Sequence, residues 1–241
     1  MRKQQLGVSF GDKHSVRDLM LILKSMKIGI PEPKTSIIDV PGRNGNIDAS
    51  EYIYDSPVYD NRELIFNFAF SKKDKWAWET WKSRILNLIH GRKLQIVLDN
   101  SLSWYYLGRV KVEASEDDGS VMNITVKVDA DPFKYSFVAS ADGENWKWDE
   151  LNFVDGVIYQ HKFSVPAGTT TISVPNSSMS VVPTIIANNV ITLEFKGKTY
   201  SIDKNAIITD PTIMLTNGSN EMKITAQKET VIKINFKVGI L

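Results

Sequence analysis

Residues 121 to 129 read VMNITVKVD, and the alternation of apolar and polar side chains in this stretch decides the fold class. A period of two is typical of a β-strand that buries one face. Just upstream, residues 104 to 112 (WYYLGRVKV) show a similar pattern, and the polar segment ASEDDGS joins the two. The pair therefore predicts two antiparallel strands in a mainly β protein. The residues on the apolar face of the second strand are Met122, Ile124, Val126 and Val128.

Further strands are predicted on both sides of this pair. Leu64, Phe66, Phe68 and Phe70 share one face of a strand, and Leu94, Ile96 and Leu98 share one face of another. The stretch VRDLMLILKSM, residues 16 to 26, fits both a helix and a buried strand, so its state is left open.

One segment has helical periodicity instead, residues 71 to 90, SKKDKWAWETWKSRILNLIH. Ser71 can cap its N-terminus together with Asp74, and Gly91 suits its C-terminal stop. The tryptophans could form a ligand platform, but we favour a helix laid on a sheet, because large aromatics bury much area. The apolar face of this helix comprises Trp78, Trp81, Ile85, Leu88 and Ile89.

Two domains are expected, residues 1–138 and 139–241. Proline ends a strand at Asp131-Pro132, and every arginine in the chain lies at or before Arg109. Later residues form short alternating segments such as KFSV, VITLEF, TIML and VIKINFKV, separated by turn signals such as Lys196-Gly197. Short strands with no helix between them predict a β-sandwich.

The segment DVPGRNGNID, residues 39 to 48, carries two turn signals around one arginine. Pro41-Gly42 suits a type II turn, and Asn44-Gly45 suits a type I′ turn. Glycine-rich loops can cradle phosphate, but no nucleotide-binding pattern surrounds these residues. Arg43 is therefore expected either to brace an internal turn or to contact a partner, and the sequence does not choose between the two.

The composition excludes several classes of function. The chain has 241 residues, no cysteine and a formal net charge of +1, which disfavours thiolate chemistry and broad electrostatic binding to nucleic acid or anionic membrane. The longest apolar run, residues 19 to 23, is far too short to span a bilayer. No signal-peptide core follows the basic N-terminus, so we expect synthesis and folding in the cytoplasm.

No catalytic, cofactor or metal site is predicted. Gly7-Val8-Ser9-Phe10-Gly11 matches the nucleophile elbow, but the α/β scaffold that this motif needs is missing, so we interpret it as a strand and a turn. The three histidines are far apart and form no metal-ligand pattern, and Glu116-Asp117-Asp118 lacks the spacing of a calcium loop.

Trp146 and Trp148 alternate beside acidic residues in the segment DGENWKWDE, residues 142 to 150. Aromatic rings that stack on sugars and acids that bond hydroxyls are what a carbohydrate site uses. Because the cluster lies at the predicted domain junction, we favour packing between domains and keep sugar contact as the alternative.

Several segments in order resemble one family. They are VPGRNGNID, then Tyr59-Asp60-Asn61-Arg62, the Trp-rich helix ending at His90-Gly91, WYYLGRV, and ITVKVDADPFKY. Together they resemble the distal tail (Dit) proteins of long-tailed phages and prophages of Gram-positive bacteria, over residues 1 to about 136. The C-terminal half is similar to the second domain of longer members, around SVPNSSMSVVPTIIA and TNGSNEMKITA.

The resemblance implies a non-enzymatic structural protein of the tail tip. It implies a homo-hexameric ring built by residues 1–138, with a galectin-like C-terminal β-sandwich projecting outward. The implied partners are the tail tube protein, a tail-associated hub or lysin protein, and a tape-measure or receptor-binding protein. The alternative is a carbohydrate-binding adhesion module carried by the C-terminal domain.

Overall fold

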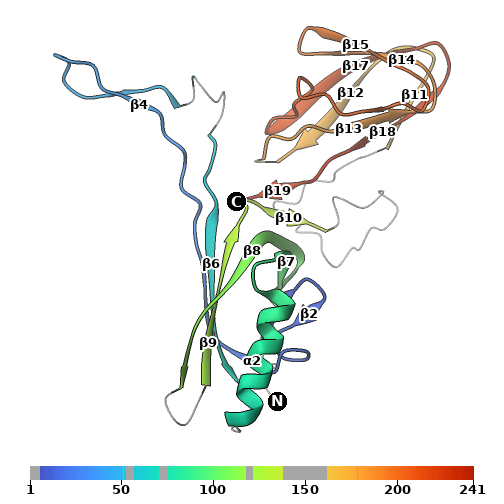
Figure 1. Cartoon of the computed structure of the whole chain (residues 1–241). Helices are drawn as coiled ribbons and strands as arrows, with labels where there is room; N and C mark the ends of the chain where they lie inside the picture. Colours follow the sequence, from blue (N-terminus) through green and yellow to red (C-terminus); the bar gives the residue numbers. More distant parts are fainter. Residues whose placement is uncertain are drawn as a thin grey trace. The chain divides into compact units, whose positions relative to one another are not determined.

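The structure, a computed structural model, describes residues 6–50, 52, 57–70, 75–117, 122–137, 162–177 and 179–241. The chain divides into two compact units, residues 1–134 with Leu241, and residues 135–240 (Figure 1). The predicted domain boundary, between residues 138 and 139, lies within residues 138–161, which are outside the described part of the chain. This boundary therefore stays a prediction.

An antiparallel sheet in the order β2-β1-β7-β8-β9-β6-β3 forms the frame of the first unit. Strands β8 and β9 pair with Val112 opposite Val126, so the strand pair predicted from residues 104 to 129 is confirmed. The strands of this sheet are β1 (Val8–Phe10), β2 (Lys13–His14), β3 (Leu21–Ile28), β6 (Arg62–Phe70), β7 (Lys93–Leu98), β8 (Ser101–Asp117) and β9 (Met122–Ala130).

The stretch that sequence left open, residues 16 to 26, is a turn followed by a strand. Met20 has a positive φ of 55°, which ends the turn, and the chain then enters β3. Leu21 pairs with Phe70 and Ile28 with Leu64, so β3 runs along the whole of β6. The strand β6, more than thirty positions further along the chain, therefore decides that residues 21–28 form a strand and not a helix.

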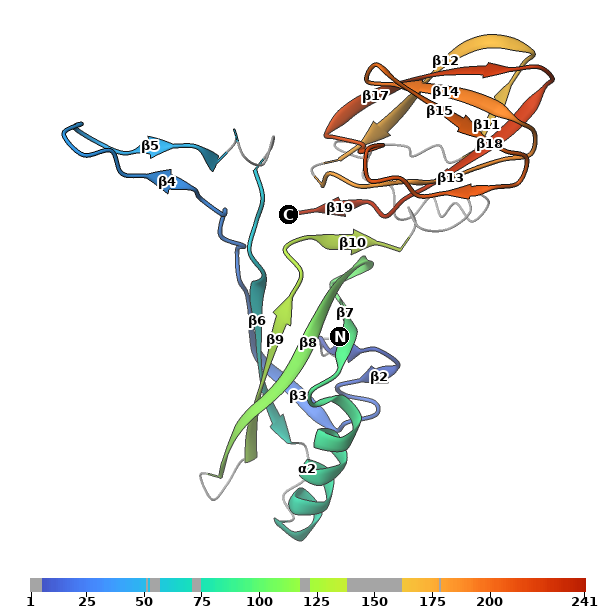
Figure 2. The same cartoon turned by 45° about the horizontal axis from the view of Figure 1, so that its top comes forward.

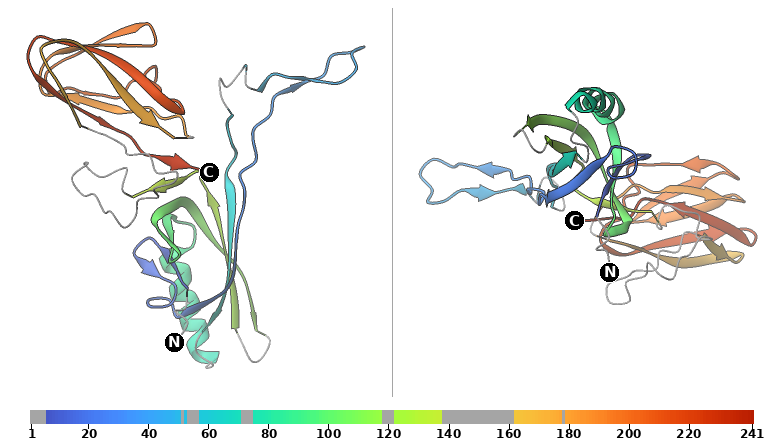
Figure 3. Two further views of the ribbon diagram at one scale, coloured as in Figure 1. Left: turned by 180° about the vertical axis from the view of Figure 1, so that it is seen from behind. Right: turned by 90° about the horizontal axis from the view of Figure 1, so that it is seen from below.

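Helix α2 (Lys75–Ile89) covers one face of this sheet (Figures 1 and 3). Trp78, Ile85 and Ile89 are buried, and Trp81 and Leu88 are partly buried against the same core. The predicted helix and its apolar face are thus confirmed, whereas the predicted cap at residues 71–74 lies outside the described residues. The ring of Trp78 packs on Phe70 with 5.1 Å between ring centroids.

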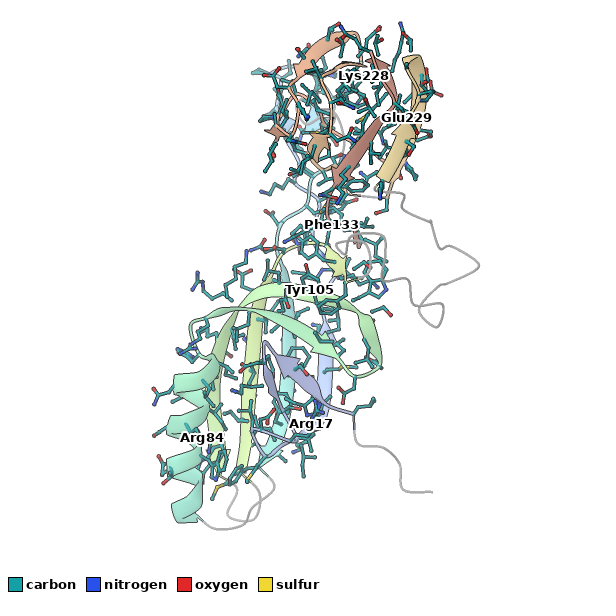
Figure 4. The ribbon with its side chains drawn as sticks, turned by 90° about the vertical axis from the view of Figure 1, so that its right-hand side faces the viewer. Arg17, Arg84, Tyr105, Phe133, Lys228 and Glu229 are labelled. Atoms are coloured by element: carbon teal, nitrogen blue, oxygen red, sulfur yellow. The ribbon has the colours of Figure 1, made fainter. Side chains whose placement is uncertain are left out.

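The two tryptophans of α2 are expected to differ in their contribution to stability. Trp78 is 5% exposed, so Trp78→Ala should lower the free energy of unfolding by about 3–5 kcal/mol. Trp81→Ala should cost less, because Trp81 is only half buried and carries Arg84 on its outward side, with the guanidinium 4.6 Å from the ring centre (Figure 4). Urea unfolding of each variant measures both values. An unchanged midpoint for Trp78→Ala would show that this face of the helix is not packed as described.

Between β3 and β6 the chain runs out as a long hairpin, which we call the arm and define as the described residues 30–50, 52 and 57–60 (Figure 2). Its outer part is a two-stranded ribbon of β4 (Ile37–Ile38) and β5 (Ile47–Asp48). Ile38 lies opposite Ile47 in this ribbon.

The second unit is a sandwich of two four-stranded antiparallel sheets, ordered β11-β18-β13-β16 and β12-β17-β14-β15. Side chains from both sheets close one core, with Ile185 and Ile234 from the first and Val174 and Leu193 from the second. The predicted β-sandwich is confirmed. The strands are β11 (Lys162–Val165), β12 (Gly168–Asn176), β13 (Thr184–Ala187), β14 (Ile191–Phe195), β15 (Lys198–Ile202), β16 (Ile207–Ile208), β17 (Gly218–Ala226) and β18 (Thr230–Asn235), with β10 (Lys134–Ser136) pairing β19 (Gly239–Ile240) outside the two sheets.

Local turn chemistry explains where these strands begin and end. Lys196 and Gly197 have φ values of 47° and 77°, so they form the tight turn that joins β14 to β15. One predicted strand is wrong: residues 212–215 form only an isolated bridge, between Leu215 and Val181. Asp210 accepts hydrogen bonds from the backbone and hydroxyl of Thr212 there, which holds the segment in a turn.

Candidate functional site

The arm is the feature of the first unit that its own core does not explain. Its base is tied down by backbone hydrogen bonds from Lys34 to Val58 at 2.7 Å and from Asp60 to Glu32 at 2.8 Å. The ring of Tyr59 packs edge-on against Phe133, with 5.9 Å between ring centroids. The backbone bonds therefore join the two strands of the arm at its base, and the Tyr59–Phe133 contact packs this base on the rest of the first unit.

Polar side chains fix the start and end of the outer ribbon. The hydroxyl of Ser50 accepts a hydrogen bond from the backbone N–H of Ser36 at 2.7 Å. Asp48 in turn accepts bonds from the hydroxyl and the backbone of Ser50, and these bonds lower the pKa of the Asp48 carboxyl. The ribbon is thus locally specified even though it is not covered by a core.

At the tip, one predicted turn is confirmed and the other is wrong. Gly42 has a φ of 81°, and Arg43 N–H donates to Val40 carbonyl oxygen at 3.1 Å, which matches a type II turn at Pro41-Gly42. Gly45 also has a positive φ, but Asn44 does not, so the pair cannot form the predicted type I′ turn. The chain instead reverses over residues 39–46, which join β4 to β5, and Arg43 among them is exposed.

The arm exposes large apolar side chains on both faces of its ribbon. Ile37 is 57% exposed on one face, and Ile38 is 48% exposed beside Ile47 on the other. Ile30 and Tyr52 are also exposed along the arm. A two-stranded ribbon is marginally stable in water by itself. An uncovered apolar ribbon of this kind is typical of a surface that another protein covers.

The G-x-S-x-G match around Ser9 lies on β1 and the turn that follows it. His14 sits opposite Ser9, and its Nε2 is 3.2 Å from the Asp99 carboxylate. Its Nδ1 accepts hydrogen bonds from the backbone N–H groups of Val16 and Arg17. The ring hydrogen therefore resides on Nε2, and neither nitrogen is left to take a proton from Ser9. The expected strand and turn are confirmed here, and His14 acts as a clamp on the N-terminal hairpin.

A hollow of about 380 Å³ lies on the outer face of β6, β9 and β8. Lys127 bridges Glu113 at 3.0 Å and Glu63 at 3.7 Å, and Lys111 pairs with Glu113 at 3.3 Å. The hydrogen bond from Lys127 lowers the pKa of Glu113, and Glu113 raises the pKa of Lys127. The charges on this face compensate one another, as on a solvated sheet surface.

Within the part of the chain that the structure describes, no group of acidic or histidine side chains could hold a metal ion. The same described residues include no helix long and apolar enough to cross a bilayer.

The predicted junction or sugar residues Trp146 and Trp148 lie outside the described residues, so both interpretations stay predictions. The described outer face of β12 and β17 carries hydroxyl side chains, including the hydrogen-bonded pairs Thr169–Thr225 and Ser173–Ser219. The outward side chains of these two strands include no aromatic ring that could stack on a sugar.

Sequence reasoning missed two features of the first unit. It singled out the tip of the arm but not the isoleucines behind it, although Ile37-Ile38 and Ile47 flank the turn in the sequence. It also recognised the apolar alternation of β6 only from Leu64 onward. Arg62 occupies the preceding position on the same face and is buried. A charged residue in phase with a buried face was the signal that could have found it.

No family model and no curated protein matches this chain. Among solved structures, the chain is similar to the crystal structure of the Dit protein of phage SPP1, with a TM-score of 0.65 and 12% sequence identity. The match covers 99% of this chain and 100% of that one, and the SPP1 protein is described as a paradigm of the hub adsorption apparatus in phages that infect Gram-positive bacteria. The resemblance predicted from the sequence is thereby confirmed in three dimensions: this chain has the fold of a phage distal tail protein.

Proposed function

We propose that this protein is a non-enzymatic structural component of a phage or prophage tail tip. It would form a ring that joins the tail tube to the hub and the adsorption apparatus. The fold shared with the SPP1 protein supports this role. The observation that carries the ring itself is the uncovered arm, with Ile37, Ile38 and Ile47 exposed on a two-stranded ribbon.

Burial of these side chains by a neighbouring copy gives the ring its driving force. Each isoleucine moved from water into an apolar contact contributes roughly 1.5–3 kcal/mol. The arm of one copy meets a different surface on the next, so the contact is heterologous and repeats until the rotation closes. Arg43 at the exposed tip supplies a planar, multi-donor head of the kind that is enriched at interfaces.

The finer parts of the proposal follow the family resemblance. The ring is a homo-hexamer built by residues 1–138, and residues 139–241 project outward. The partners are the tail tube protein, a tail-associated hub or lysin protein, and a tape-measure or receptor-binding protein. The protein assembles in the bacterial cytoplasm and ends in the virion tail tip.

A cysteine placed at the tip of the arm tests this proposal, because the chain contains no other cysteine. Arg43→Cys, labelled with a short photo-crosslinker, should form crosslinks between copies that map to the first unit of the neighbour. Lys228→Cys, at the turn between β17 and β18, is the matched control and should form few (Figure 4). Crosslinked species should end at six copies on denaturing gels.

Crosslinks from Arg43→Cys that stay within one chain at every concentration would favour the intradomain turn. A ladder that ends at another copy number would contradict the hexamer but keep the arm as the interface.

A further inference from the structure

Arg62 is a buried cation at the base of the arm. It is the first residue of β6 and lies in phase with Leu64 and Phe66 on the core face, where it is 5% exposed. Its guanidinium lies over the ring of Tyr106, 5.5 Å from the ring centre.

The guanidinium of Arg62 is only partly satisfied by hydrogen bonds. Its Nε and Nη2 atoms are buried and have no hydrogen-bond partner. Leaving buried donors of a charged group unpaired is costly, and a cation–π contact offsets only part of that cost. Burial accordingly lowers the pKa of Arg62. An arginine held in this way has the donors of one edge prepared for an acceptor that the described residues do not supply.

A second cation lies next to it. Lys134 places its ammonium over Trp104, 5.6 Å from the ring centre. Trp104 and Tyr106 are two residues apart on β8, so they share one face of the strand. The two cations therefore lie over neighbouring rings. Burial lowers the pKa of Lys134, and the charge of Arg62 lowers it further.

Neither cation is compensated by an acid. Among the described residues, no carboxylate forms an ion pair with Arg62 or with Lys134, whereas Lys93 and Lys127 of the same unit each pair with one. Two adjacent positive charges with one unpaired guanidinium edge match the charge and the planar geometry of a carboxylate.

We propose that Arg62 and Lys134 form a receptor site for a carboxylate side chain of a second copy of this chain. Nε and Nη2 of Arg62 are buried in the single chain, so the side chains that cover them shift on binding. The two oxygens then accept hydrogen bonds from Nε–H and Nη2–H of Arg62, and Lys134 supplies the second charge. Lys134 is only half buried, so the carboxylate approaches from its side. Arg62 lies two residues after the end of the arm, so the site is at the base of the element that carries the proposed interface. The identity of the donor as a second copy rests on that proposed function.

The site itself is tested on the single chain, with malonate as the probe. At a concentration where the full chain is monomeric, malonate at about ten times its Kd should raise the Tm by about 3 °C over sodium chloride of equal ionic strength. Arg62→Met should abolish this shift, and Lys134→Met should reduce it. Arg84→Met is the matched control, since it removes an exposed arginine that also stacks on an aromatic ring, and it should keep the full shift.

A second experiment measures association between copies. Arg62→Met and Lys134→Met should each raise the concentration at which the chain associates by about tenfold, which corresponds to one lost charge-assisted pair. If Arg62→Met does not fold, Lys134→Met tests the role of the site in association. Lys134 is half exposed, so its replacement should leave the fold intact.

Absence of any malonate shift beyond that of chloride in the unaltered protein would overturn the site, whatever the state of the ring. A malonate shift with unchanged association in both variants would overturn the second copy as the donor and keep a site for carboxylates. A protein that forms no ring but shows the shift would count against the proposed function and not against the site.

Discussion

Simultaneous replacement of Ile37, Ile38 and Ile47 by asparagine is expected to abolish ring assembly while the first unit stays folded. The three side chains lie on the ribbon and outside the core, so their loss does not open a cavity. Each side chain is already partly shielded, so their burial in an interface contributes roughly 4 kcal/mol in sum, equivalent to a loss of association on the order of a thousandfold. Light scattering over a concentration series, beside the thermal unfolding of the same samples, measures both effects.

A matched control comes from the second unit. Ile207 is 71% exposed on β16 and is not part of the arm. Ile207→Asn should leave assembly unchanged if the arm carries the interface. If the triple variant associates as strongly as the unaltered protein, the arm is not part of the interface. If Ile207→Asn loses as much association as the triple variant, exposed isoleucines act only through non-specific hydrophobic association.

Gly108→Val is expected to prevent the first unit from folding stably. A Cβ atom at Gly108 would lie 2.6 Å from a methyl carbon of Val128 and 2.7 Å from the Cα of Ala130. One of these contacts is backbone, at the end of the β8–β9 pair where Gly108 lies opposite Ala130, so it cannot swing away as a flexible side chain would. Forcing the strands apart should cost about 3 kcal/mol or more, at the upper end for overpacked interiors. Tryptophan fluorescence in urea reports the loss.

Gly42→Ala serves as the comparison for this variant. A Cβ atom at Gly42 meets nothing within 4 Å, but its φ of 81° is strained for alanine. The expected cost is about 1–2 kcal/mol, and it falls on the arm and not on the sheet. If both glycine variants unfold at the same urea concentration, the close approach of β8 to β9 is not what constrains position 108.

Local signals in the sequence predicted the elements of this fold well. The apolar alternation of β9 and the periodicity of α2 depend only on which residues must face a core, so they survive in any tertiary context. The turn at Pro41-Gly42 was predictable for the same reason, since proline fixes one dihedral angle and glycine permits the next. Asn44 shows the limit of such signals, because asparagine tolerates a positive φ but does not require it.

The arrangement of the elements could not be predicted in the same way. β1 pairs with β7, with Val8 opposite Leu98, across a separation of ninety residues. Nothing in either segment encodes its partner, because a strand with one apolar face fits beside many others. The candidate site at Arg62 and Lys134 could not be predicted for the same reason. Arg62 and Lys134 come from distant parts of the chain, and only the rings of β8 bring them together.

The two hydrophobic cores described above have a further consequence for how this protein changes over generations. One cluster, built around Phe66 and Ile85, is complete within the first unit, and the other, built around Leu193 and Ile234, is complete within the second. Among the described residues, no buried side chain belongs to both clusters. Substitutions that repack one of these described cores therefore contact no side chain of the other. Each core can change in sequence over generations while the other keeps its own packing.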